Sequence, residues 1–135
     1  MARGPRVLVG GEGAGTPLIL GRPISPLGDL DHERGVLRGE GIELKGKVLV
    51  FPYAVGSSVG SYVLYSLAAK GLSPSAIFVE KADITLASGC ALGGIPLVEL
   101  RDEYGRVKDR LSACGLARFS ARPPDHLSIA CEGTP

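Results

Sequence analysis

Short apolar runs separated by glycine, proline and polar residues set the pattern of this chain. Runs rich in Val, Leu and Ile and bounded by turn formers predict buried β-strands. Apolar residues at helical spacing predict a helix over 58–70, and a shorter helix is expected over 85–91. Strands alternating with helices predict an α/β fold in which crossover helices join parallel strands. The predicted strands cover residues 6–9, 17–20, 47–51, 76–79, 95–99 and 127–130, with shorter pieces at 35–37 and 42–44.

Glycines crowd the segment between the first two predicted strands, residues 10–15. We expect a flexible turn there. A phosphate-binding loop is the alternative, but the segment lacks the Lys-Ser or Lys-Thr ending of a P-loop. A strand pattern follows it instead of a helix, which favours the turn.

A proline- and glycine-rich segment, residues 21–46, precedes the central strand. Long loops inside a compact domain often carry function. Asp29, Asp31, His32 and Glu33 lie close together in this segment. They allow two interpretations, a metal cluster or an exposed turn capped by carboxylates, and we expect the exposed turn.

The segment between the strand at 47–51 and the helix at 58–70 is the strongest functional candidate. Gly56, Ser57 and Ser58 lie where the carboxyl end of a buried strand meets the start of a helix. The first N–H groups of a helix lack intrahelical partners, and the helix dipole is positive there. An anionic group can bind at such a place, and an oxyanion can be stabilised. The alternative is that the serines only cap the helix and allow close packing.

Composition restricts the class of protein and of partner. A chain of 135 residues is long enough for one domain with its own core. The formal net charge of +1 gives no electrostatic reason to expect binding to nucleic acid or to an anionic membrane. No apolar run approaches the roughly 20 residues that span a bilayer, and the N-terminus lacks a signal-peptide pattern. We therefore expect a cytoplasmic protein.

The three cysteines, Cys90, Cys114 and Cys131, are widely spaced. No C-x-x-C pair is present, so we expect no zinc or iron–sulfur ligand set and predict no metal site in this chain. One buried thiol and two incidental ones are expected. The chain contains neither Asn nor Gln, which is typical of proteins from hot environments; biased genomic composition is the alternative.

An ordered set of motifs gives the chain a resemblance to a known family. The Gly-Ser-Ser turn is similar to that of the swivelling β/β/α domain of aconitase-type dehydratases, and the whole set resembles the small subunit of the aconitase X family. The motifs are Gly21-Arg22-Pro23-Ile24-Ser25, Gly28-Asp29-Leu30-Asp31, Lys47-Val48-Leu49-Val50-Phe51-Pro52, Gly56-Ser57-Ser58-Val59-Gly60-Ser61-Tyr62-Val63 and Gly94-Ile95-Pro96-Leu97-Val98.

The resemblance covers roughly residues 5–100 and implies a single swivelling domain over residues 1–135. It fades from Arg101 onward, where charged residues dominate and apolar residues are sparse. We therefore expect the core to lie within 5–100 and residues 101–135 to form a peripheral tail.

The resemblance also implies roles for individual residues. Ser57 matches the first serine of the turn, which acts as the catalytic base in the relatives. Gly56, Ser58 and Ser61 are expected at the substrate, and Arg22 is a candidate anion partner.

One departure from aconitase itself bears on the substrate. There the two serines are followed by Arg-Glu, and the Arg holds a substrate carboxylate, whereas Val59-Gly60 follow here. The departure disfavours a tricarboxylate substrate and favours the aconitase X branch.

A reaction and a partner follow from the same resemblance. The archaeal two-subunit members of the family are phosphomevalonate dehydratases. The implied activity is that of a hydro-lyase subunit that helps to convert (R)-5-phosphomevalonate into trans-anhydromevalonate 5-phosphate in an archaeal-type mevalonate pathway. This chain is expected to supply the serine base, while an aconitase-like large subunit holds the iron–sulfur cluster. The small anionic substrate then lies between the two subunits.

Two other functions remain open at this point. Dehydration of hydroxyproline occurs in the same family, although many of those relatives are fused into one chain. A non-catalytic anion-binding or scaffold module belongs to a different class, and it needs no cluster-bearing partner.

Overall fold

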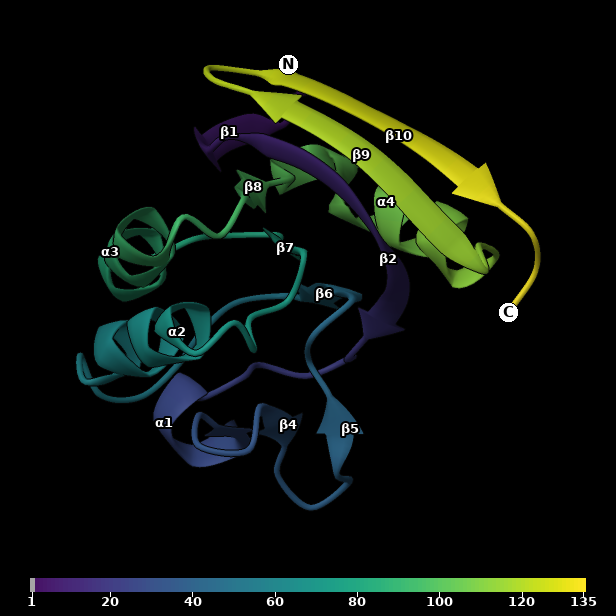
Figure 1. The fold of residues 1–135 in the computed structure, drawn as a ribbon. Helices are drawn as coiled ribbons and strands as arrows, with labels where there is room; N and C mark the ends of the chain where they lie inside the picture. Colours follow the sequence, from purple (N-terminus) through teal and green to yellow (C-terminus); the bar gives the residue numbers. More distant parts are fainter. Residues whose placement is uncertain (1) are drawn as a thin grey trace.

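A seven-stranded sheet runs through the centre of the molecule in the computed structural model, which describes residues 2–135 (Figure 1). The strands are β1 (Arg6–Val9), β2 (Gly11–Ile19), β3 (Leu30–Asp31), β4 (Val36–Leu37), β5 (Ile42–Glu43), β6 (Lys47–Phe51), β7 (Ala76–Val79), β8 (Leu97–Glu99), β9 (Leu116–Arg122) and β10 (His126–Glu132). The helices are α1 (Pro26–Asp29), α2 (Gly60–Ala69), α3 (Ile84–Gly93) and α4 (Tyr104–Ser112), with a short 3₁₀ turn, η1 (Arg101–Glu103).

The strand order of the large sheet is β1-β8-β7-β6-β2-β9-β10, and β3-β4-β5 form a separate small sheet. Neighbours from β8 to β2 are parallel, whereas β1, β9 and β10 join at the edges as antiparallel strands. Helix α2 connects β6 to β7 and α3 connects β7 to β8, as parallel neighbours require. The predicted α/β fold with parallel strands and crossover helices is confirmed.

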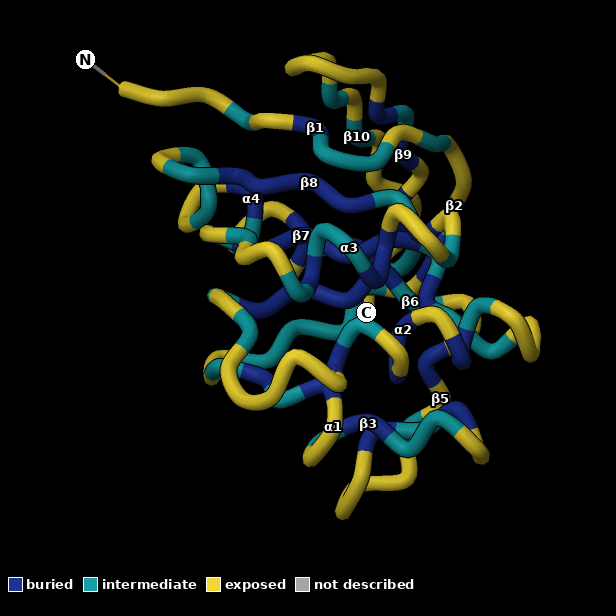
Figure 2. Tube along the Cα trace, turned by 90° about the vertical axis from the view of Figure 1, so that its left-hand side faces the viewer, coloured by how far each residue is buried: buried dark blue, intermediate teal, exposed yellow. Residues whose placement is uncertain are grey.

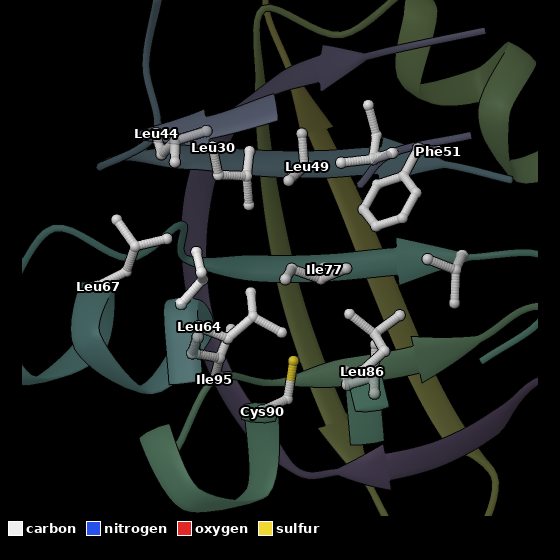
Figure 3. Packing of buried hydrophobic residues seen from close by; sticks show 14 of the residues in the cluster. Leu30, Leu44, Leu49, Phe51, Leu64, Leu67, Ile77, Leu86, Cys90 and Ile95 are labelled. Atoms are coloured by element: carbon white, nitrogen blue, oxygen red, sulfur yellow. The ribbon is translucent and has the colours of Figure 1, made fainter. Parts of the chain in front are cut away.

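Both faces of the central strands are covered, which explains their continuous apolar sequences. Side chains alternate between faces along a strand. Leu49, Phe51 and Ile77 point toward α2 and α3 and pack with residues such as Leu64 and Leu86 (Figure 3). Strands β7 and β8 are accordingly buried along their whole length (Figure 2).

The opposite face of the sheet packs against the C-terminal part of the chain. Val50 and Phe78 belong to a second apolar cluster with Val107 and Leu111 of α4 and Phe119 of β9. The expectation that residues 101–135 are a peripheral tail is therefore wrong for α4 and β9. Figure 1 shows α4 on the side of the parallel strands away from α2 and α3, enclosed there by the β9–β10 end of the curled sheet.

The glycine-rich segment is part of a strand and not the expected flexible turn. Gly10 alone separates β1 from β2, and β2 continues from Gly11 to Ile19. Residues 11–15 pair with β9, while residues 16–19 pair with β6, so one strand joins both parts of the sheet. Gly15 allows this close approach, since a Cβ there would lie 2.9 Å from the Gly46 carbonyl oxygen.

Helices α2 and α3 lie side by side on one face of the sheet (Figure 1). Their close approach depends on Gly89, where a Cβ would lie 2.8 Å from a side-chain carbon of Leu64. Each helix has ten residues. Across residues 2–135, no helix is both long and apolar enough to cross a membrane.

Candidate functional site

The predicted site residues come together at the carboxyl edge of the sheet. Strand β6 ends at Phe51, and the chain turns through 52–59 before α2 begins. A parallel bridge joins Ile24 to Ala54, with a 3.1 Å hydrogen bond from the Ile24 N–H to the Tyr53 carbonyl. This bridge places the loop that carries Arg22 beside the loop that carries the serines. Ligands of open α/β sheets bind at this edge.

Ser57 lies exposed on the turn, before the first residue of α2. Its Oγ accepts a hydrogen bond from the Val59 N–H at 3.2 Å, and its carbonyl accepts one from the Gly60 N–H at 3.0 Å. A backbone N–H that donates to a hydroxyl oxygen stabilises negative charge on that oxygen. This donor would compensate part of the negative charge of a serine alkoxide.

The sequence predicts unpartnered N–H groups in the first turn of the helix. In the structure they lie in the preceding loop instead. The N–H groups of Gly60 and Ser61 donate to the carbonyls of Ser57 and Ser58. Within residues 2–135, the N–H groups of Gly56, Ser57 and Ser58 donate to no acceptor. Three consecutive free donors on an exposed turn provide a binding surface for an anion.

Gly56 gives the turn its shape. Its φ of +100° is a conformation that side-chain-bearing residues rarely adopt, and a Cβ there would lie 2.9 Å from the Ser25 Oγ. Ser25 itself caps α1, because its Oγ accepts the Gly28 N–H at 3.1 Å. The serine turn thus packs directly on the start of α1.

Ser58 is exposed, whereas Ser61 is partly buried between two helices. The Ser61 Oγ donates to the Thr85 carbonyl at 3.1 Å and so joins α2 to α3. The expected contact between Ser61 and the substrate stays a prediction, and only the acceptor side of this hydroxyl is left for it. That bond joins residues 24 positions apart, which a local pattern does not reveal.

Arg22 is half exposed and pairs with Asp29, with 3.4 Å between its Nη1 and the Asp29 Oδ2. The same carboxylate oxygen accepts the Ser25 N–H at 2.7 Å. The Asp29 carboxylate therefore fixes the loop at Ser25 and holds the Arg22 guanidinium close to this loop. The remaining guanidinium donors are available to an anion at this edge.

The acidic segment after α1 forms the expected turn. Asp31 Oδ1 accepts the N–H groups of Glu33 and Arg34 at 3.0 and 3.1 Å. The hydrogen bond from Arg34 is the main reason that the pKa of Asp31 lies below its ordinary value. The His32 Nδ1 lies 3.0 Å from the Oγ of the buried Ser66, so this histidine ties the segment to α2.

Lys81 and Asp83 belong to the same edge, although no sequence motif assigns either of them a role. A cavity of about 340 Å³ beside the serine loop is lined by Tyr53, Ala54, Lys81, Ala82 and Asp83. Both charged residues directly follow the strand at 76–79. Their position after a parallel strand was the signal that could have identified them.

The three cysteines do not fit an iron–sulfur cluster. Burial raises the pKa of the Cys90 thiol to about 12, which keeps it protonated. Cys114 and Cys131 form a disulfide with a Cα–Cα distance of 5.2 Å, so the expectation of two incidental thiols is wrong. No group of three or more metal-ligating side chains occurs in the part of the chain that the structure describes.

Five large apolar side chains on the serine turn, on α1 and at the start of α2 are exposed. We call them the apolar collar. Tyr62 is the most exposed of them, at 59%. Exposed apolar patches of this kind mark interaction sites. The collar consists of Leu27, Tyr53, Val55, Val59 and Tyr62.

Comparison with known proteins gives concordant matches. The family model described as the aconitase X swivel domain matches residues 3–113. The phosphomevalonate dehydratase small subunit of Thermococcus sibiricus is 43% identical over 104 residues, which cover 72% of this chain and 78% of that protein. The protein of the same name from Archaeoglobus fulgidus is 41% identical over 102 residues, covering 73% and 77%. Thermophilic archaeal hosts fit the expectation drawn from the missing Asn and Gln.

Solved structures agree with these matches. The holo-form crystal structure of aconitase X from Thermococcus kodakaraensis aligns with a TM-score of 0.76 at 31% identity, covering 95% of this chain and 96% of that one. The solution NMR structure of a UPF0107 protein aligns with a TM-score of 0.77 at 32% identity, covering 97% and 98%. The resemblance drawn from the motifs and the swivelling-domain fold are confirmed, and the chain belongs to the aconitase X swivel domain family.

Proposed function

We propose that this chain is the small subunit of a phosphomevalonate dehydratase and that Ser57 is its catalytic base. The observation that carries the proposal is the exposed Gly-Ser-Ser turn, in which the Ser57 Oγ already accepts a backbone N–H. The names of the archaeal relatives support the choice of reaction.

The reaction removes one water from a β-hydroxy acid. Ser57, as the alkoxide, takes the proton from the carbon beside the substrate carboxylate. The electron pair of that C–H bond forms the C=C bond, and the hydroxyl leaves from the next carbon. The N–H of Val59 compensates part of the charge on the serine oxygen, as hydrogen-bond donors do in oxyanion holes.

Anion contacts accompany the base. The free N–H groups of Gly56, Ser57 and Ser58 form one set of donors, and the guanidinium of Arg22 forms another. Backbone donors and an arginine suit carboxylate and phosphate groups. No contact is assigned to the Ser61 hydroxyl, because it is bonded to Thr85.

The large subunit completes the site in this proposal. An iron–sulfur cluster does not fit the cysteines of this chain, so the cluster belongs to the partner. The apolar collar suits burial against a second protein, because its residues lie on and next to the turn that carries the base, and this base must be shielded from water.

The test reconstitutes the chain with a cluster-bearing large subunit and supplies (R)-5-phosphomevalonate. Mass spectrometry is expected to detect the product that has lost one water. The isolated chain should show neither turnover nor iron–sulfur absorbance. Turnover of a hydroxyproline or of citrate instead would move the chain to another branch, and activity without a partner would contradict the subunit model.

Variants of the turn test the base itself. Ser57→Ala should abolish turnover, because general-base catalysis typically raises a reaction rate by about 10²–10⁴-fold. Ser61→Ala is the matched control, since it removes a helix–helix hydrogen bond and should lower stability with little effect on rate. Normal activity in Ser57→Ala, with loss in Ser58→Ala, would assign the base to the other serine.

A further inference from the structure

A second, strongly basic cavity lies at the same edge of the sheet, beyond the ends of β7 and β8. It has a volume of about 300 Å³. It shares Lys81 and Ala82 with the cavity beside the serine loop, so the two adjoin along the carboxyl edge. We call it the basic pocket. Its lining consists of Arg3, Arg6, Lys81, Ala82, Glu99 and Arg101.

The charges of the basic pocket are unbalanced. Glu99 is the single carboxylate among its lining residues, against four cationic side chains. The two Glu99 oxygens are already engaged, Oε1 with Arg6 at 3.0 Å and Oε2 with the Ala82 N–H at 2.9 Å. Among the lining residues, cationic side chains therefore outnumber carboxylates by three. Such a concentration of one sign attracts anions.

Asp83 and Asp102 are neighbours of the lining residues in the sequence, but neither of them lines the pocket. The Asp102 Oδ2 accepts the backbone N–H of Arg3 at 2.6 Å. The Asp83 Oδ1 caps α3 by accepting the Leu86 N–H at 2.8 Å. Within residues 2–135, neither Lys81 nor Arg101 forms a salt bridge.

Arg101 is held in place by its backbone and by its side chain. Its φ of +53° is positive, which is unusual for a residue other than glycine and costs energy. Its Nε donates to the Gly4 carbonyl at 2.8 Å, and its backbone N–H donates to the Glu80 carbonyl at 3.1 Å. Strain of this kind persists where the surroundings enforce it, and it is concentrated at binding sites. Within residues 2–135, the terminal guanidinium nitrogens of Arg101 form neither a hydrogen bond nor a salt bridge.

We propose that the basic pocket binds an oxyanion of the phosphate class. A compact dianion matches a small cavity with unpaired arginine and lysine donors, because guanidinium groups bind phosphate oxygens in a fixed geometry. The site goes beyond the dehydratase function, since it uses neither Ser57 nor the large subunit. Its position next to the serine loop makes free phosphate and the phosphate end of a metabolite the two sources to compare.

The experiment titrates the full-length, ¹⁵N-labelled chain with inorganic phosphate at constant ionic strength and follows backbone amide shifts. Saturable shifts are expected for residues 3–6, 80–83 and 99–102. Arg101→Gly relieves the positive φ while removing the guanidinium, so the fold should survive, and binding should weaken at least tenfold. Lys81→Ala should weaken it similarly. Lys45→Ala is the control, because Lys45 is exposed just before β6, at the opposite edge.

Two results would overturn the proposal. The first is a set of linear, non-saturating shifts, or equal binding in Arg101→Gly and in the control. The second is that phosphate leaves the pocket unchanged while the large subunit protects it, which would make it a protein contact. A parallel titration with 5-phosphomevalonate separates the sources. If this compound binds more tightly than inorganic phosphate, the pocket is assigned to the phosphate end of a metabolite. If the two bind equally, the pocket is assigned to free phosphate. Loss of dehydratase activity alone has no bearing on these readouts.

Discussion

The backbone conformation of Gly56 sets the geometry of the serine turn. The effect of this geometry on turnover can be separated from a general loss of stability. We predict that Gly56→Ala destabilises the chain by about 1–3 kcal/mol and abolishes turnover, because a Cβ would press on the Ser25 Oγ. Gly71→Ala is the control: its φ of +71° is also positive, but nothing lies within 4 Å of the added Cβ. Thermal unfolding and assays of the reconstituted pair measure both effects. Equal turnover in the two variants would show that the turn geometry is unimportant.

The buried Cys90 thiol makes the stability of the fold decrease at alkaline pH. Burial raises the pKa of its thiol from 9.0 to about 12, so the unfolded chain loses this proton before the folded chain does. The stabilisation is complete below pH 9, and it is lost as the pH rises toward 12. One such group lowers the free energy of unfolding by about 1.4 kcal/mol per pH unit in that window. Thermal unfolding between pH 8 and 11 should show a shallower decline in Cys90→Ala, and identical slopes would contradict the prediction.

Local patterns located part of the site but not its contacts. The position of Ser57 could be predicted because a buried strand, a glycine and a helical pattern follow one another within a few residues. The bond from Ser61 to Thr85 could not, since it depends on how α2 and α3 pack. Lys81 was overlooked because a single lysine after a strand carries no motif, and its importance comes from neighbours distant in sequence.

The same division holds for whole elements. Strands β6 and β7 were predicted with their observed bounds because both faces of each are buried. Strand β2 was missed over Gly11–Gly15, since glycine disfavours strands and is needed here only for close approach to other strands. Helix α4 was missed although Val107 and Leu111 have helical spacing, because its many charges outweighed two apolar residues.

A disulfide connects two elements of the C-terminal part. Cys114 follows α4 and Cys131 lies in β10, so their bond fastens the outer hairpin to the rest of the domain. A disulfide stabilises a fold by typically about 2–4 kcal/mol. We predict that reductant lowers the unfolding temperature of the wild type and leaves Cys114→Ala/Cys131→Ala unchanged. Non-reducing mass spectrometry that found three free thiols would contradict this.

At the scale of the whole molecule, the apolar collar gives the chain a side that is suited to a partner. The collar residues lie on the serine turn, on α1 and at the start of α2, whereas the exposed Leu92 lies near the C-terminal end of α3. If the large subunit covers the serine turn, the collar residues contribute to subunit association and Leu92 does not. A charge in the collar must lose its hydration on association, while a charge at Leu92 stays in water.

We therefore predict that Val59→Asp weakens association with the large subunit at least tenfold and that Leu92→Asp does not. Val59 is 48% exposed and precedes α2 without a side-chain cap, so an acidic residue there is favourable to the helix dipole and should leave the fold intact. Circular dichroism of the free variants checks the fold, and analytical ultracentrifugation of the mixtures measures association. Because both variants add one negative charge, a difference between them reports on position and not on net charge. Normal assembly of Val59→Asp, or loss of assembly in Leu92→Asp, would place the subunit contact elsewhere on the molecule.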